Sequence, residues 1–250
     1  MPLALKKVFA ALFILCAACS GALWFAPATW LDLVASTATS GQLRVVQAQG
    51  RLWNGSGVIA VDLGGLKPLT RELHFSLRPS LIPLGFSMQI SGQGLQWSDQ
   101  PSEIQYRNGS LKIPAGQLEG LIIDSTGSPT LLGLAQVSGQ INLQWPTVIW
   151  SQQGVSGQGQ VSAEFRNIAS ALAPIRPLAN LRAELSIANP ESRPWNVSST
   201  ADSVIMLSAR GDLKEKTAEG SLRCQRFCDY VRGALLLLGK PSGEDYVFSF

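Results

Sequence analysis

The chain has 250 residues, of which 46% are hydrophobic and only 15% are charged. This length suits one β-rich domain with an accessory segment, or two small domains, and is ample for a sizeable core. The low content of charged residues excludes a disordered acidic or basic tail. The formal net charge of +3 is dispersed, which excludes a nucleic acid as partner because phosphate binding needs clustered Lys and Arg.

The first segment of the chain is apolar. Lys6 and Lys7 precede an uncharged run that ends at Leu31. A helix of ~20 apolar residues crosses a bilayer, and lysines on its N-terminal side keep that end in the cytoplasm. We therefore expect a cytoplasmic N-terminus at 1–7, a transmembrane anchor at 8–31 and an extracytoplasmic β-rich domain at 32–250.

Within this anchor, Val8, Phe13 and Leu15 are expected to contact lipid, and Trp24 lies where an interfacial aromatic belt would fall. A cleaved signal peptide is the main alternative, with residues 18–20 (Ala-Cys-Ser) as its cleavage site. A lipoprotein signal fits less well. The aromatic continuation past residue 20 favours an uncleaved, single-pass anchor in a bacterial inner membrane, with the bulk of the chain in the periplasm.

After the anchor, apolar and polar residues alternate. This period of two predicts half-buried strands, and sheets of such strands are typically antiparallel. The clearest runs are 72–78, 86–91, 140–145 and 246–250. We expect a mainly β fold, in which an N-terminal transmembrane helix precedes a curved, mostly antiparallel periplasmic β-sheet with a short C-terminal helix.

Turn signals punctuate these runs. Asn54-Gly55 and Asn108-Gly109 each predict a type I′ hairpin turn, whose two central residues need positive φ. A small-Gly-Gln tripeptide recurs, and its glycine predicts a tight turn or bulge at a strand start. The tripeptides occupy 40–42, 91–93, 115–117, 138–140 and 156–158. Their irregular spacing excludes a solenoid.

Near the C-terminus, five apolar residues fit one face of a helix that ends at Gly239 and Pro241. They are Phe227, Val231, Ala234, Leu235 and Leu238. We expect this helix to pack on the sheet. A subdivision of the domain near 145–157 is also expected.

Candidate catalytic chemistry is scarce. His74 is the single histidine, and it lies on the polar side of an alternating strand. A serine triad would need it, yet no Gly-x-Ser-x-Gly elbow accompanies it, and zinc sites need three or four ligands at characteristic spacing. No phosphate-binding loop is present. We therefore expect no enzyme activity, no catalytic residue, no metal and no cofactor.

The exported cysteines Cys224 and Cys228 are expected to form a disulfide, which an oxidising periplasm permits. In an extended strand, residues four apart are separated by ~13 Å, too far for a bond. Residues 224–228 are therefore predicted to form a turn or the start of a helix.

Residues 50–57, Gly-Arg-Leu-Trp-Asn-Gly-Ser-Gly, resemble a motif of the type II secretion system protein N family, in which a single membrane helix precedes a glycine–tryptophan hairpin. Residues 73–79, 236–241 and 246–248 resemble later family segments, so the resemblance covers essentially the whole chain. It implies a non-catalytic accessory subunit of the machine that exports folded proteins. Its implied partners are the inner-membrane platform, the outer-membrane pore, or both.

In this family hairpin, Trp53, Asn54 and Gly55 are the candidate contact residues for another subunit, because aromatics are favoured at interface hot spots. The alternative is that Trp53 pins the hairpin to its own sheet. A rival function is lipid binding or transport, which would require an open apolar groove on the sheet.

Overall fold

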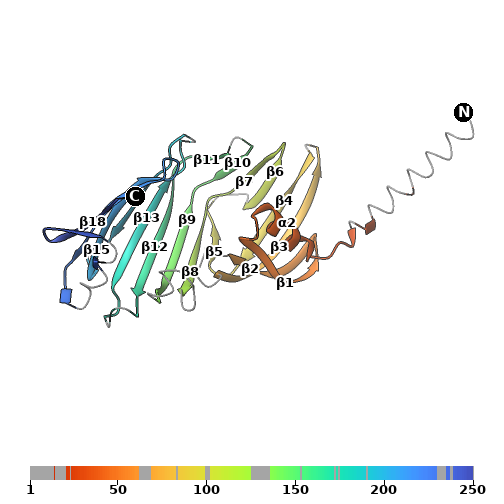
Figure 1. Cartoon of the computed structure of the whole chain (residues 1–250). Helices are drawn as coiled ribbons and strands as arrows, with labels where there is room; N and C mark the ends of the chain where they lie inside the picture. The colour runs from red at the N-terminus through yellow and green to blue at the C-terminus, as the bar shows by residue number, and fades with distance from the viewer. Residues whose placement is uncertain are drawn as a thin grey trace, which may run out of the picture.

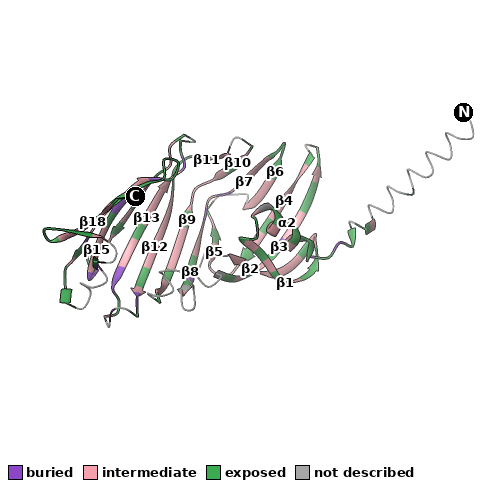
Figure 2. Cartoon of the chain, viewed as in Figure 1, coloured by how far each residue is buried: buried purple, intermediate pink, exposed green. Residues whose placement is uncertain are grey.

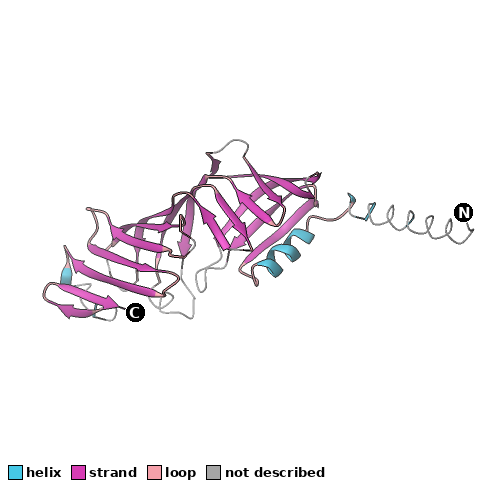
Figure 3. Cartoon of the chain, turned by 90° about the horizontal axis from the view of Figure 1, so that it is seen from above, coloured by secondary structure: helices cyan, strands magenta, loops and turns pink. Residues whose placement is uncertain are grey.

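The computed structural model describes residues 14, 21–22, 24–61, 69–82, 84–98, 102–124, 136–152, 154–171, 173, 175–189, 191–229, 235–236 and 239–249. These residues form two long sheets that lie in one curved row, as Figures 1 and 3 show. Every strand pair is antiparallel. The prediction of a mainly β, antiparallel fold is thus confirmed.

The first sheet has eight strands in the order β1-β2-β3-β4-β6-β7-β10-β11. Their bounds are β1 (Leu43–Arg51), β2 (Asn54–Val61), β3 (Leu69–Leu81), β4 (Leu84–Gly92), β6 (Glu103–Arg107), β7 (Ser110–Ile113), β10 (Val148–Ser151) and β11 (Gly154–Gly157). One short helix, α2 (Trp30–Ala38), packs against β1. The first sheet therefore carries the N-terminal end of the fold.

The second sheet has ten strands in the order β17-β18-β16-β15-β14-β13-β12-β9-β8-β5. Their bounds are β5 (Leu95–Trp97), β8 (Gly116–Asp124), β9 (Ser138–Trp145), β12 (Gln160–Ala169), β13 (Ala179–Ser186), β14 (Pro194–Ser199), β15 (Ile205–Asp212), β16 (Thr217–Cys224), β17 (Lys240–Ser242) and β18 (Asp245–Ser249). From β12 onward the chain stays in this sheet.

Between β4 and β12 the chain passes repeatedly from one sheet to the other. Strands β5, β8 and β9 belong to the second sheet, whereas β6, β7, β10 and β11 belong to the first. The expected subdivision near 145–157 coincides with β10 and β11, the last excursion into the first sheet. The two sheets are therefore interleaved in sequence.

The alternating strands take the predicted orientation. In β3, Phe75 is only 7% exposed, whereas His74 points to the solvent side and is exposed. Residues 246 and 248 of β18 behave in the same way, and residue 250 lies outside the described part. A period of two therefore separates one apolar face from one polar face along each sheet.

The two Asn-Gly signals have different outcomes. Asn108 and Gly109 have φ of 50° and 79° and join the paired residues Arg107 and Ser110, so this type I′ turn is confirmed. The prediction is wrong for the other pair, because Asn54 itself pairs with Arg51 and the turn consists of residues 52–53.

Gly55 is instead required for space inside β2. A Cβ at this position would lie 2.7 Å from Cζ of Phe75 on the neighbouring strand β3. Gly55 also pairs directly with Gly50 of β1. The glycine of this motif therefore accommodates an aromatic ring, whereas the prediction had assigned it to the turn.

The glycines of the small-Gly-Gln tripeptides also differ from the prediction of a tight turn or bulge. Only Gly41 has positive φ, at 85°. The other four lie within strands, where an added Cβ would approach the neighbouring strand closely; they are Gly92, Gly116, Gly139 and Gly157. Their main role is close packing between strands.

The N-terminal end of the fold differs from the expected continuous helix through residue 31. Pro27 forms a β-bridge with Arg51, and the N–H of Leu52 donates to the carbonyl of Ala26 at 2.8 Å. The backbone therefore leaves the helical path before α2 begins at Trp30. No helix in the described part of the chain is long and apolar enough to cross a membrane; Val8, Phe13 and Leu15 lie outside that part.

At the C-terminal end, helical backbone is present at 228–229 and 235–236. Leu235 is 1% exposed and packs with Leu178 and Leu222 in the main buried cluster. The prediction that Phe227 lies on the packed face of the helix is wrong. Phe227 is 59% exposed and has φ of 57°, so it belongs to the turn. Val231, Ala234 and Leu238 lie outside the described residues.

Candidate functional site

The apolar face of the second sheet is the largest candidate surface. The strand register aligns one apolar row across every strand of the sheet except β17. The row consists of Leu95, Leu118, Leu143, Ala163, Ala183, Val197, Ala209, Gly220 and Phe248. A continuous apolar strip therefore runs across the sheet.

This strip is only half covered. Of its members only Ala209 is buried, at 8% exposed, and the others are intermediate. In the described chain, the buried apolar residues include many alanines, and only Ala173, Leu178, Leu222 and Leu235 among them form a cluster, at one end of the sheet. Figure 2 shows the result: intermediate residues run along most strands, and buried ones are scattered. The apolar faces thus remain accessible to a further layer.

Aromatic rings on this face lie over glycines of neighbouring strands. A Cβ at Gly211 would lie 2.8 Å from Cζ2 of Trp195, and a Cβ at Gly220 would lie 2.6 Å from Cζ of Phe248. Such pairing covers an otherwise bare glycine and stabilises the strand.

A corner of tryptophans joins the two sheets. The Nε1–H of Trp97 donates to the carbonyl of Ile90 in β4, at 2.8 Å. The Nε1–H of Trp145 donates to the carbonyl of Pro114, at 2.9 Å. Gly116 lies between the two indoles, with a would-be Cβ 2.9 Å from Cζ2 of Trp145. The N–H group of each indole is therefore hydrogen-bonded. The two rings hold the first and second sheets together at this corner.

Arg71 adds a second link between the sheets. It lies in β3, and its guanidinium donates to the carbonyl of Gly120 in β8. Gly120 has φ of 69° within a bulge of β8, and its own N–H donates to Oδ1 of Asn142 at 2.8 Å. The bulge thus turns a carbonyl toward the first sheet, where the arginine holds it.

The opposite face of the second sheet is a polar, solvated surface. Gln117 donates to Gln96 at 2.8 Å, and Arg210 pairs with Glu219 at 2.6 Å. Such exposed ion pairs contribute only about 0–1 kcal/mol each. Two open clefts of about 820 and 730 Å³ are lined mainly by residues of β14 to β18, and the first includes Ala209, Gly220 and Phe248 of the apolar strip.

Three carboxylates, Asp32, Asp212 and Asp245, have a pKa lowered by their surroundings, the last by Arg223. Asp32 of α2 accepts hydrogen bonds from Arg44 and from the N–H of Val45, which lower its pKa to about 2. The hydroxyl of Ser192 and backbone N–H groups lower the pKa of Asp212. Asp32 fastens α2 to the edge strand β1, and Asp212 organises a turn, so both are structural.

The candidate catalytic residue His74 is exposed on β3 and lies opposite Ser56 and Ser91. In the described residues, no group of three or more His, Cys, Asp or Glu side chains could hold a metal. His74 therefore lies on a polar strand face between two serines.

The hairpin of residues 50–57 lies beside the N-terminal segment, since Pro27 forms a β-bridge with Arg51. Trp53 is half-buried at its tip, and its carbonyl accepts the N–H of Leu77 at 2.9 Å. Asn54 is exposed and pairs with Ser76 of β3. Trp53 is thus held by its own sheet while keeping part of its surface open. Trp24 is 65% exposed.

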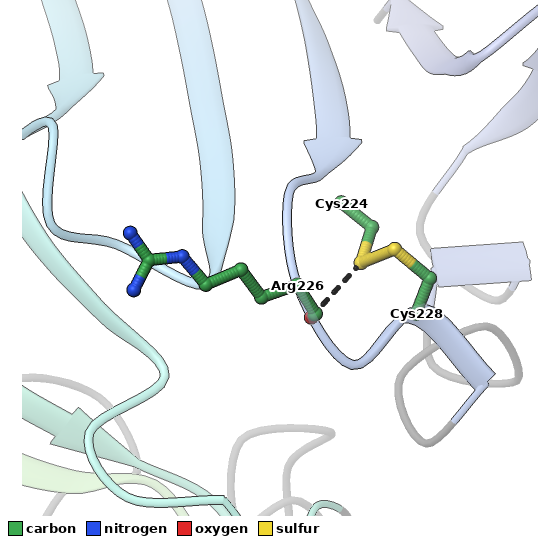
Figure 4. The surroundings of a disulfide bond; sticks show 3 residues. All are labelled: Cys224, Arg226 and Cys228. Atoms are coloured by element: carbon green, nitrogen blue, oxygen red, sulfur yellow. Dashed lines mark hydrogen bonds between the residues drawn. A yellow bond between two sulfur atoms is a disulfide. The ribbon is translucent and has the colours of Figure 1, made fainter.

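Cys224 and Cys228 form a disulfide, with their Cα atoms 5.5 Å apart. Cys224 ends β16, and Cys228 begins the helical residues that follow. Figure 4 shows the loop folded around this bond, with Sγ of Cys224 3.3 Å from the carbonyl oxygen of Arg226. The bond anchors the segment that leads to Leu235.

The aromatic–glycine pairs and the junction between the sheets were not predicted from sequence. Each pair joins residues of different strands, so recognising it requires the register. Comparisons of the chain with protein-family models, curated proteins and solved structures found no match in any of the three.

Proposed function

We propose that this chain is a non-catalytic accessory subunit of the type II secretion system, anchored in the inner membrane with its β domain in the periplasm. The observation that carries the proposal is the hairpin of residues 50–57. Its sequence resembles the family motif, and its geometry gives the motif residues distinct roles. Gly50, with φ of 91°, and Gly55 shape the hairpin, and Trp53 stands at its tip.

The open sheet faces also support a scaffold role. An apolar surface that a chain leaves half covered is typical of an interaction site. Two of the four sheet edges are less suitable for strand addition: the carboxylate of Asp32 occupies the N–H of Val45 on β1, and Pro241 lies within β17. Partner subunits would therefore bind the faces and the hairpin tips.

The test is a secretion assay in the source bacterium. Deletion of the gene should leave exported type II substrates in the periplasm, and the full-length chain should restore their release. The Trp53→Ala variant should restore less, whereas Trp30→Ala, which removes a 48% exposed indole from α2, should restore as much as the wild type. Unchanged secretion in the deletion strain would contradict the proposal.

A second function, periplasmic lipid binding or transport, is favoured by one specific observation, the continuous half-covered apolar row of the second sheet. A lipid acyl chain could lie along such a row. Lipid extraction from the purified full-length chain, followed by mass spectrometry, distinguishes the two functions. Stoichiometric acyl lipid that is lost from a Leu143→Glu variant would favour the second function.

A further inference from the structure

One end of the first sheet gathers four hairpin tips. Because Arg51 pairs with Asn54, Leu81 with Leu84, Arg107 with Ser110 and Ser151 with Gly154, the connections between these strands all lie on the same side. The bridge between Pro27 and Arg51 brings the N-terminal segment to this side as well. We call this end the hairpin rim; it comprises the described residues 24–28, 50–54, 78–82, 84–85, 106–110, 150–152 and 154.

The rim carries the most exposed apolar side chains of the two sheets. Leu81, Ile82 and Leu84 are 82%, 94% and 76% exposed. They form the end of the β3–β4 hairpin, where the strands continue beyond the last pairing with β2, between Asn54 and Ser76. A single exposed apolar residue needs no explanation, but three such residues close together at a protruding tip form a contact surface.

Aromatic residues flank this tip. Phe86 and Tyr106 stack with centroids 5.3 Å apart, and Trp150 is 49% exposed further along the same cross-strand row. On the side of the N-terminal segment, Phe25 is 67% exposed. Aromatic residues around an apolar tip are typical of groups placed at the level of lipid headgroups.

The charge of the rim has one sign. Arg51, Arg78 and Arg107 belong to it and are exposed, and its segments contain no Asp or Glu. Within the described residues, none of the three arginines forms a salt bridge, whereas Arg44, Arg166, Arg182, Arg210 and Arg223 all do. Arg51 lies over the ring of Phe25, 5.1 Å from its centroid, which leaves Arg78 and Arg107 as the cations beside the exposed apolar tip. Cations without a carboxylate partner beside exposed apolar residues complement a surface of anionic headgroups over acyl chains.

We propose that the hairpin rim binds the surface of an anionic phospholipid membrane, with Leu81, Ile82 and Leu84 inserted below the headgroups and Arg78 and Arg107 at their level. This contact orients the first sheet with its strands directed away from the bilayer. It is independent of the secretion role, because any membrane-associated function would use it.

A fluorescent probe at the tip tests this contact in the full-length chain. The probe is an environment-sensitive dye on an Ile82→Cys variant that also carries Cys16→Ala and Cys19→Ala; Cys224 and Cys228 are protected by their disulfide. A matched control carries the dye on Lys214→Cys, in the exposed β15–β16 turn of the second sheet. Both proteins are reconstituted in vesicles of phosphatidylethanolamine and phosphatidylglycerol.

The expected result is a blue-shifted emission of the tip probe and its quenching by lipids with spin labels in the acyl chains, with neither effect at position 214. Arg78→Gln with Arg107→Gln should lower the ratio of docked to undocked tip by roughly fivefold per arginine. Lysine at both positions should preserve docking. Circular dichroism checks that the variants are folded.

A tip probe that stays as solvent-exposed in these vesicles as in detergent would overturn the proposal. Docking that is equally strong in purely zwitterionic vesicles would remove the role of the arginines and overturn it as well. Shielding of the tip that needs an added secretion subunit and no lipid would assign the rim to a protein partner instead.

Discussion

The indole rings of Trp97 and Trp145 meet edge to face at the corner between the two sheets, with centroids 6.0 Å apart and planes at 84°. This is a favourable geometry for aromatic pairs. One ring is tied by a hydrogen bond to β4 of the first sheet and the other to the segment that enters β8. Within the described residues, cohesion between the sheets therefore depends on this small corner together with the link from Arg71 to the carbonyl of Gly120.

Truncation of this corner should destabilise the whole protein. The Trp97→Ala variant should lower the free energy of unfolding by about 3 kcal/mol, at the low end of values for tryptophan because the ring keeps some exposure. Urea unfolding of the full-length chain in detergent measures this. Trp30→Ala is the control and should change little. Equal losses in the two variants would show that the corner has no special role.

A methyl group placed between the two indoles should also be costly. Gly116→Ala puts a Cβ 2.9 Å from Trp145 and 3.1 Å from Trp97, and overpacking of this kind costs about 1–3 kcal/mol. Gly109→Asn is the matched control, because no atom lies within 4 Å of a Cβ there and asparagine tolerates positive φ. If Gly116→Ala unfolds at the wild-type urea concentration, the rings do not close over the glycine.

Acid should release α2 from the edge of the first sheet. The pKa of Asp32 is about 2 in the folded chain, below its ordinary value of about 3.9. The contribution of Asp32 to the stability of the folded chain is therefore fully present above about pH 4 and is lost as the pH falls through about 2. Hydrogen-exchange protection of the Val45 amide, corrected for intrinsic rates, reports this change.

In the Asp32→Asn variant, Val45 should be less protected near neutral pH and should show no corresponding acid transition. An Asp245→Asn variant provides the control, since Asp245 pairs with Arg223 at the other end of the molecule. Protection of Val45 that is the same in all three proteins would rule out the proposed role of the carboxylate.

Reduction of the disulfide should loosen the C-terminal end of the second sheet. Closing so short a loop stabilises the fold by about 2 kcal/mol in the chain-entropy model. Urea unfolding with and without reductant should differ by this amount in the wild type. A Cys224→Ser, Cys228→Ser variant should be insensitive to reductant, and an equal response in this variant would assign the effect to Cys16 and Cys19.

The local structure was more predictable than the assembly of the sheets. Alternation identified β3, β4, β9 and β18 because one face of each meets solvent, and the turn at Asn108 followed from its dihedral preference. The same dipeptide at Asn54 did not form the turn, since residue 55 lies within β2, where a Cβ would meet both the carbonyl of Gln49 on β1 and the ring of Phe75 on β3. A contact between residues of different strands can be identified only once the strand register is known.

The candidate surface was likewise only half predictable. The sequence shows that each strand has an apolar face, yet it does not show which strands share a sheet, and β5, β8 and β9 are separated along the chain by strands of the first sheet. The spacing of Cys224 and Cys228 implied a turn because the geometry of a disulfide is local. The hairpin rim was not predicted, since its arginines and apolar residues come from separate hairpins.

The most direct test of the proposed secretion role is photocrosslinking in living cells from position 53 at the hairpin tip and position 143 on the open apolar face. With a photoreactive amino acid at these positions, the account predicts adducts with subunits of the secretion platform or pore, identified by mass spectrometry, and none from an exposed control position at Lys214. Adducts with acyl lipid alone, or no adducts from either position, would contradict it.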